Sequence, residues 1–290
     1  MAKLKQKLEQ KEFVLTAEIS PPKGAGTKRL KEHIQSISPH VTAINITDSQ
    51  RSVVRMASWA ACKIIMDCGS EPIYQVTCRD RNAIALQSDL MGASALGIPN
   101  LLCLTGDPVK VGDHPSSKSV FEMESVGLLK MVESLQSGKD SQDNKLNAPT
   151  RFFVGAVVNP TLQGGGSQFE RMKKKCESGA QFFQTQANYD LEDLGRFLQS
   201  AKELRRPILV GVLVLHSAEI AHFIHKNIPG IQLPSPVLQR MEQSNNPEQE
   251  GIRIALETMQ TLKFHCAGFH LMTIRKEYLI PQLVKGFYGF

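Results

Sequence analysis

Asp107 stands where a carboxylate could serve a binding or catalytic site. The stretch Asn100-Leu-Leu-Cys-Leu-Thr-Gly-Asp107 is an apolar run that stops at this acid and is followed by Pro108. Gly106 allows a backbone conformation that other residues resist, and Pro108 cannot continue a hydrogen-bonded strand, so we expect a strand to end here. Parallel α/β folds bind ligands at the carboxyl ends of their strands. Asp107 is therefore a candidate site residue; the alternative is a turn aspartate that accepts backbone hydrogen bonds.

Glu18 is a second candidate acid, in a different setting. It lies in the apolar run Phe13-Val-Leu-Thr-Ala-Glu-Ile19, just before Pro21-Pro22. Burial disfavours a charged carboxylate, so we expect a raised pKa and a neutral acid that can donate a proton. The alternative is a salt-bridged glutamate at a strand end. Two acids in different environments can divide an acid role from an electrostatic one.

Further polar residues end the other apolar runs and extend the candidate site. They are Thr47, Asp48, Gln75, Thr77, Thr105, Asn159, Gln184, Gln186 and Thr273. Four histidines fall in predicted loops or helices without metal-ligand spacing, namely His114, His216, His222 and His225. We assign these histidines structural roles and predict no metal site.

The elements that must position these residues alternate between strand-like and helix-like patterns. Strands are predicted at 13–19, 41–47, 73–78, 100–107, 151–158, 181–186, 207–213 and 268–273. Helices are predicted at 27–37, 53–68, 82–96, 122–136, 167–178, 190–204, 217–226 and 249–262. Such alternation predicts a single-domain α/β protein, a (β/α)8 TIM barrel. The alternative is an open doubly wound sheet. The absence of a G-x-G-x-x-G motif after the first strand argues against it.

Three segments do not belong to this alternation. Residues 1–12 are expected to form a charged helix or a frayed arm before the barrel. The polar segment 137–150 is predicted to be a mobile loop, and 230–247 is an insertion. Gly164-Gly-Gly166 is expected to open the helix at 167–178.

The composition favours a cytoplasmic protein that binds an anionic ligand. The 290 residues are 41% hydrophobic, without a run of bilayer length or the apolar core of a secretion signal at the start. The six cysteines form no C-x-x-C pair, which favours reduced thiols. The net charge of +6 suits a phosphorylated cofactor. Dispersed basic residues and an aromatic content of 6% argue against nucleic-acid binding, and no membrane association is expected.

Several motifs in order resemble one family. They are Ala17-Glu-Ile-Ser-Pro-Pro22, Thr77-Cys-Arg-Asp-Arg-Asn82, Leu86-Gln-Ser-Asp-Leu90, Leu104-Thr-Gly-Asp-Pro108, Gly112-Asp-His-Pro115 and Gly268-Phe-His-Leu-Met-Thr273. From about residue 13 to 285 the chain resembles methylenetetrahydrofolate reductase, in its short prokaryotic form. The resemblance implies a flavoprotein barrel that reduces 5,10-methylenetetrahydrofolate to 5-methyltetrahydrofolate, in one-carbon metabolism and methionine biosynthesis.

The resemblance also implies residue roles. Glu18 matches the family's general acid, and Asp107 matches an aspartate that stabilises cationic character in the substrate and tunes the flavin. Substrate contacts are expected from Gln186, Glu219, Phe223 and Arg275. Flavin contacts are expected from Thr47, Gln75, Thr105, Gly106, Asp107, Phe121, Glu122, Asn159 and Lys175. Core packing is the alternative for Phe223, and a solvated basic helix face is the alternative for Lys175.

Two departures from the family leave the choice of flavin cofactor open. Gln75 stands where a histidine is often found, and Thr105 replaces an arginine, so positive charge near the cofactor is lost. FAD is expected, with FMN as the alternative, and the electron donor is NADH or a partner iron–sulfur protein. A homo-oligomer is expected. Two other functions are weighed: a flavin-free, folate-binding methyl-transfer module, and a subunit that docks onto a redox complex.

Overall fold

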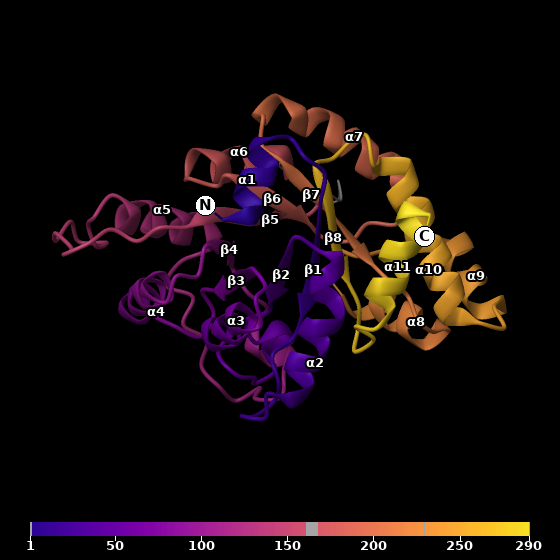
Figure 1. The fold of residues 1–290 in the computed structure, drawn as a ribbon, viewed down its shortest axis with the longest axis horizontal. Coiled ribbons are helices and arrows are strands. Elements are labelled where there is room, and N and C mark those ends of the chain that lie inside the picture. Colours follow the sequence, from indigo (N-terminus) through magenta and orange to yellow (C-terminus); the bar gives the residue numbers. More distant parts are fainter. Residues whose placement is uncertain (1, 161–167, 229, 290) are drawn as a thin grey trace.

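Parallel strands close into a barrel at the centre of the molecule (Figure 1). The computed structural model describes residues 2–160, 168–228 and 230–289. The strands of this barrel, in chain order, are β1 Val14–Ile19, β2 Ala43–Ile46, β3 Pro72–Thr77, β4 Asn100–Leu104, β5 Phe153–Val158, β6 Phe182–Thr185, β7 Ile208–Leu213 and β8 Gly268–Met272. Each strand pairs in parallel with the next, and β8 pairs with β1, so no edge is left open. The predicted (β/α)8 barrel is confirmed, and the open sheet is wrong.

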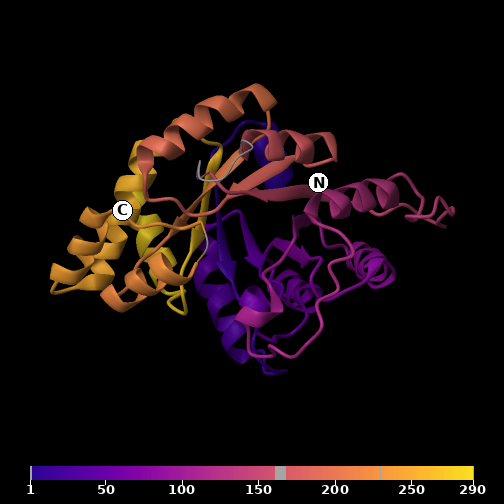
Figure 2. The same ribbon diagram turned by 180° about the vertical axis from the view of Figure 1, so that it is seen from behind.

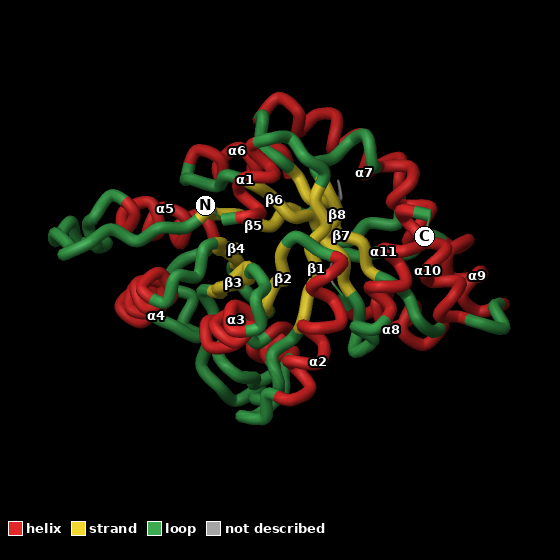
Figure 3. Tube along the Cα trace, in the orientation of Figure 1, coloured by secondary structure: helices red, strands yellow, loops and turns green. Residues whose placement is uncertain are grey.

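Helices surround the strands on the outside (Figure 3). They are α1 Lys3–Glu9, α2 Lys28–Ile37, α3 Ser58–Asp67, α4 Ala83–Ala95, α5 Ser125–Gln136, α6 Gln168–Glu177, α7 Leu191–Ala201, α8 Ala218–Asn227, α9 Ser235–Gln243, α10 Pro247–Leu262 and α11 Leu279–Tyr288. Two of these helices are absent from the prediction: α9 lies in the insertion at 230–247, and α11 follows the last strand. The expected glycine opening at 164–166 lies outside the described residues.

Alternation along the strands separates two apolar regions and a polar layer. In β1, Leu15, Ala17 and Ile19 face outward into the core between the strands and the helices. Thr16 and Glu18 have the opposite parity and face the barrel interior. The polar groups inside the barrel therefore follow from a two-residue period in otherwise apolar strands.

The amino end of the barrel is closed by apolar side chains. One buried cluster gathers interior residues near the starts of the strands: Val14, Ala43, Ile73, Leu102, Phe153, Phe182 and Leu209. Leu4 and Leu8 of α1 join this cluster. Glu71 fixes the start of α1, because its carboxylate accepts hydrogen bonds from the backbone amides of Lys3 and Leu4. The predicted N-terminal segment is thus a helix that packs on the barrel.

The segment 137–150 projects beyond α5, farther from the strands than the neighbouring loops (Figure 2). Lys139 and Lys145 form an isolated antiparallel bridge within it. Asp140 accepts hydrogen bonds from the backbone amides of Gln142 and Asn144 and from the side-chain amide of Asn144. The predicted polar loop is a hydrogen-bonded turn in this structure.

The described residues contain neither a membrane-spanning helix nor a cluster of metal ligands. No helix there has the length and apolar character needed to cross a membrane. No group of three or more acidic, histidine or cysteine side chains in that part of the chain could hold a metal ion. All six cysteines are free thiols, as expected.

Candidate functional site

Glu18 lies at the carboxyl end of β1 with three polar neighbours. Its Oε1 accepts a hydrogen bond from Gln50 Nε2 at 3.1 Å, and its Oε2 accepts one from Gln75 Nε2 at 3.0 Å. His270 Nε2 of β8 lies 3.6 Å from the same Oε2. Only 14% of the Glu18 side chain is exposed. Strands β1, β3 and β8 thus bring together one candidate acid, one predicted flavin contact and a histidine.

The expected direction of the Glu18 pKa is wrong. Burial does raise the pKa of this carboxyl, and it is the largest single influence. Hydrogen bonds from His270, Gln75 and Gln50 act in the opposite direction and together lower the pKa below its ordinary value. Glu18 is therefore a carboxylate at neutral pH, and it can act as an acid only after it acquires a proton.

His270 is a site residue that the sequence interpretation did not include. Its ring is 3% exposed, and Nδ1 lies 3.1 Å from both Thr16 Oγ1 and Asn45 Nδ2. An amide nitrogen can only donate, so Nδ1 accepts, and the proton of a neutral ring is on Nε2, facing Glu18. The alternation of side chains along a strand could have identified it. Phe269 and Leu271 face the outer core, so the histidine between them faces the barrel interior.

The polar layer around His270 is costly to bury. Thr16, Asn45 and Gln184 are at most 1% exposed. Gln184 Nε2 lies 3.5 Å from Thr16 Oγ1, while Gln184 Oε1 and Asn45 Oδ1 have no hydrogen-bond partner among the described residues. Buried polar atoms without partners destabilise a fold, so their presence directly beneath Glu18 points to a functional requirement.

Asp107 follows β4 on an exposed turn. Gly106 has φ +98°, as expected from its predicted role, and a Cβ there would lie 3.0 Å from Thr77 Cβ. The Asp107 carboxylate accepts a hydrogen bond from the backbone N–H of Arg51 at 2.8 Å. The turn alternative thus describes part of its bonding, while the exposed carboxylate remains at the carboxyl-end rim, where the site was predicted.

Arg51 connects two predicted site residues. Its backbone amide contacts Asp107, and its guanidinium carbon lies 4.8 Å from the centre of the Phe223 ring. Phe223 is partly buried and also packs in the apolar cluster of α8 and α9. The Phe223 ring therefore packs in the core on one side and contacts Arg51 at the carboxyl end of the barrel on the other. Nothing in the sequence pattern indicated Arg51, because the contact joins segments more than 170 positions apart.

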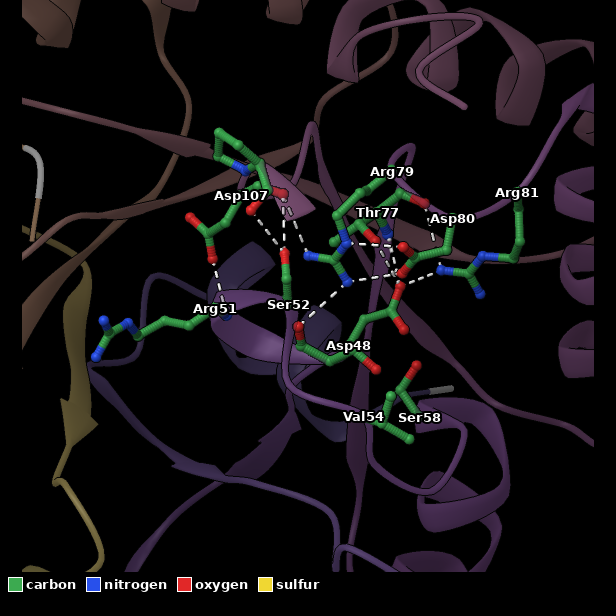
Figure 4. Close-up of polar contacts among 12 residues, drawn as sticks. Asp48, Arg51, Ser52, Val54, Ser58, Thr77, Arg79, Asp80, Arg81 and Asp107 are labelled. Atoms are coloured by element: carbon green, nitrogen blue, oxygen red, sulfur yellow. Dashed lines mark hydrogen bonds and ion pairs between the residues drawn. The ribbon is translucent and has the colours of Figure 1, made fainter. Parts of the chain in front are cut away.

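A buried arginine holds the loops that carry Arg51 and Asp107 (Figure 4). Arg79 is 1% exposed; its Nη2 donates to the Ser49 carbonyl at 3.1 Å and its Nη1 contacts the Asp107 carbonyl at 3.5 Å. Asp80 binds the same guanidinium through two hydrogen bonds. Ser52 Oγ reaches the Asp107 carbonyl at 3.2 Å. The loop after β2 and the turn after β4 are thereby fixed to each other.

A second ion pair orders the ends of β2 and β3. Asp48 accepts hydrogen bonds from the Thr77 amide and hydroxyl, each at 2.9 Å, and pairs with Arg81. Arg81 also pairs with Asp89 of α4 at 2.9 Å. Burial lowers the pKa of Arg81, but Asp48 and the other groups around it outweigh that effect and raise it well above its ordinary value. Arg81 therefore stays positively charged, and its charge serves the ion pairs with Asp48 and Asp89.

The predicted flavin contacts fall into two groups. Thr47, Gln75 and Thr105 stand on adjacent strands at the carboxyl end, and their hydroxyl and amide groups suit the edge of a flavin ring, which has both donors and acceptors. Several others have structural partners. Thr105 Oγ1 also accepts from the Ser125 amide, and Glu122 accepts from the Ala83 amide at the start of α4.

Lys175 does not face open solvent. Its Nζ donates to the Val157 carbonyl of β5 at 2.6 Å, and burial lowers its pKa. Neutral donors at the rim fit the flavin ring, whereas a phosphate contact from Lys175 would require this lysine to change partner. Phe121 has φ 41° and packs against the outer core, and Asn159 directly follows β5.

The predicted folate contacts lie on the same face of the barrel. Gln186 follows β6, and its backbone amide donates to the Val158 carbonyl at 2.9 Å. Glu219 and Phe223 are one turn apart on α8; Glu219 is exposed, and its hydrogen bond with Ser217 lowers its pKa. Arg275 follows β8, is exposed and has φ 59°. The structure places these residues around the carboxyl end of the barrel.

Fold and site together define a (β/α)8 barrel protein with its polar centre at the carboxyl ends of the strands. A family model described as methylenetetrahydrofolate reductase matches residues 3–287, and the chain belongs to that family. The match covers nearly the whole chain, as the motif resemblance predicted.

Curated relatives agree with this family and are longer than the chain. A probable methylenetetrahydrofolate reductase (NADPH) of Caenorhabditis elegans is 21% identical over 244 residues, covering 80% of this chain and 34% of the relative. Methylenetetrahydrofolate reductase 2 of Schizosaccharomyces pombe is 25% identical over 236 residues, covering 72% of this chain and 34% of the relative. The chain thus matches about a third of each relative's length.

Solved structures show a similar fold. An uncharacterized protein from Clostridium thermocellum that binds two copies of 5-methyl-5,6,7,8-tetrahydrofolic acid has a TM-score of 0.68 and 16% identity, with 99% of both chains covered. Oxaloacetate acetylhydrolase has a TM-score of 0.52 and 12% identity, covering 97% of this chain and 81% of that one. At these identities the likeness concerns the fold alone.

Proposed function

We propose that this protein reduces 5,10-methylenetetrahydrofolate to 5-methyltetrahydrofolate with a bound flavin as the hydride source. The observation that carries the proposal is the arrangement of Glu18, Gln75 and His270 at the carboxyl end of the barrel. Membership of the methylenetetrahydrofolate reductase family supports it. The Clostridium thermocellum neighbour adds that a barrel of this shape accommodates a reduced folate.

Glu18 is the proposed general acid, and its surroundings suggest how it becomes protonated. Opening of the substrate's five-membered ring requires a proton on the departing nitrogen. Glu18 starts as a carboxylate, and a bound folate would remove its remaining water and so favour the protonated form. The neutral His270 ring, whose Nε2 lies 3.6 Å away, holds the carboxylate in position, and the proton itself comes from solvent before the folate closes the site.

Asp107 is proposed to stabilise the cation that forms when the ring opens. A fixed negative charge lowers the energy of positive charge that develops nearby. Arg51 N–H and the Arg79 framework hold the turn that carries this carboxylate. Gln186, Glu219, Phe223 and Arg275 are proposed to orient the folate above it.

Thr47, Gln75 and Thr105 are proposed to hold the flavin ring, which when bound and reduced supplies the hydride. The remaining proposed contacts come from Gly106, Phe121, Glu122, Asn159 and Lys175. FAD is the proposed cofactor, with FMN as the alternative. NADH or a partner iron–sulfur protein is the proposed donor, and a cytoplasmic homo-oligomer is the proposed state.

The visible spectrum of the purified protein tests the flavin. We expect flavin absorbance that bleaches anaerobically with a reductant and returns when methylenetetrahydrofolate is added. A colourless protein that takes up no flavin but binds methyltetrahydrofolate would favour the methyl-transfer module. Tight binding to a redox complex without folate turnover would favour the docking subunit.

Rapid mixing of a Glu18→Gln variant tests the acid. Reduction of the flavin needs no proton on folate, so that half-reaction should be unchanged, whereas folate reduction should slow by roughly a hundredfold or more. Equal slowing of both half-reactions would assign Glu18 a structural role. Normal folate reduction would exclude it as the acid.

A further inference from the structure

The Arg51 side chain has an unusual setting at the mouth of the barrel. Its guanidinium lies over the Phe223 ring, 4.8 Å from Cζ to the ring centre. In the part of the chain that the structure describes, this guanidinium has no hydrogen bond and no ion pair. Figure 4 shows the side chain extending away from the Arg79 cluster. Arg51 thus offers five N–H donors that the described protein does not use.

The loop that carries Arg51 is held in a strained conformation. Ser49, Arg51 and Ser52 have φ values of 44°, 55° and 56°. Non-glycine residues rarely adopt such values, and they persist when surrounding contacts impose them. Arg79 bonds to the Ser49 carbonyl, and Ser52 Oγ bonds to the carbonyls of Asp107 and Pro108. The position of Arg51 is therefore imposed by a buried framework, unlike that of an ordinary surface arginine.

We propose that Arg51 is the residue that recognises the carboxylates of the glutamate tail of a reduced folate. This inference rests on the proposed function and deepens it, because it assigns a recognition role to a residue outside the predicted site. The guanidinium matches a carboxylate in charge and in bidentate geometry. Phe223 holds it in place before the ligand arrives, which reduces the entropy lost on binding.

The shape of the ligand determines which of its groups meets Arg51. A folate is elongated, with a pterin at one end and carboxylates at the other. Glu18 is 14% exposed in its side chain and lies over the buried polar layer, so it suits the pterin end. The tail must then leave through the mouth, where Arg51 and Asp107 stand. Arg51 supplies the positive charge there, beside the negative charge of Asp107.

Binding measurements on two ligands test this assignment. The ligands are 5-methyltetrahydrofolate and 5-methyltetrahydropteroate, which lacks the glutamate. We expect Arg51→Ala to weaken binding of the folate by roughly tenfold to a hundredfold, the effect of a lost charged hydrogen bond, and to leave pteroate binding within about twofold. Arg51→Lys should lie between, because lysine keeps the charge without the fork.

Lys110→Ala is the matched control. Lys110 is an exposed cation in the short 3-10 helix at 109–111, which lies against the Arg51 loop, and its loss should leave both affinities unchanged. Equal weakening of both ligands by Arg51→Ala, or of neither, would overturn the role of Arg51 while the proposed function stands. Failure of the unaltered protein to bind either ligand would overturn the proposed function itself.

Discussion

At the scale of single residues, the site depends on how charge is balanced around two carboxylates. Glu18 is largely buried and surrounded by donors, whereas Asp107 is exposed and bound to one backbone amide. The donors around Glu18 outweigh its burial, so Glu18 is ionised before ligand binds. Two features separate the acid role of Glu18 from the electrostatic role of Asp107. Glu18 lies deeper in the barrel, and of the two acids only Glu18 contacts His270.

The lowered pKa of Glu18 predicts a pH dependence of stability. A carboxyl whose pKa is lower in the folded state than in the unfolded state stabilises the fold above the unfolded pKa. That stabilisation is lost as the pH falls through the folded pKa, below the ordinary value of 4.5. Urea unfolding of the protein and of Glu18→Gln from pH 7 to pH 3 should show the wild-type advantage shrinking as the pH falls. A constant difference would mean that the Glu18 pKa is the same in both states.

Asp107→Asn should keep the fold and slow folate reduction. Asparagine retains a carbonyl oxygen to accept the Arg51 amide hydrogen, but it removes the negative charge. We expect folate reduction to fall on the order of a hundredfold, as for other fixed electrostatic groups, with flavin content unchanged. Stopped-flow folate reduction measures the rate, and the flavin spectrum is the control. Unchanged folate kinetics would leave Asp107 with its turn role alone.

At the scale of elements, strand ends supply the site and loops give it shape. The sequence predicts the strand ends well, because apolar runs give way to polar residues at Thr47, Asp107 and Gln186. The interior face of each strand follows from the alternation of side chains along it, and His270 could have been found from that alternation. The loop after β2 could not, since its conformation depends on Arg79, which binds Ser49 thirty positions earlier in the chain.

Gly112→Ala tests how tightly that loop packs. A Cβ at Gly112 would lie 1.9 Å from the Ser52 carbonyl oxygen, so one of the two loops must move. We expect a loss of about 1–3 kcal/mol in the free energy of unfolding, together with weaker folate binding. Urea unfolding and folate titration measure the two effects.

Gly24→Ala is the control for this change. It adds the same methyl group where no atom lies within 4 Å, and it should alter neither quantity. If Gly112→Ala behaved like Gly24→Ala, the contact between the two loops would be unimportant for the site.

At the scale of the whole molecule, the two ends of the barrel have separate tasks. The amino end is apolar and closed by α1, while the carboxyl end holds the charged and hydrogen-bonding groups. The alternation of strands and helices was enough to predict the barrel. The closure by α1 was not predictable in the same way, because Leu4 and Leu8 lie among lysines and glutamines and their packing partners come from seven different strands.

This separation predicts that the amino end can be weakened without damage to the site. Leu4 is fully buried, so Leu4→Ala should leave a cavity and lower the free energy of unfolding by about 2–5 kcal/mol. Leu96→Ala, at a position 39% exposed, should change it by less than about 0.5 kcal/mol. Folate affinity of the folded Leu4→Ala protein should match the wild type, because the cavity opens beneath the polar layer and away from Glu18. A large loss of affinity at temperatures where the variant is fully folded would show that the apolar closure also supports the geometry of the site.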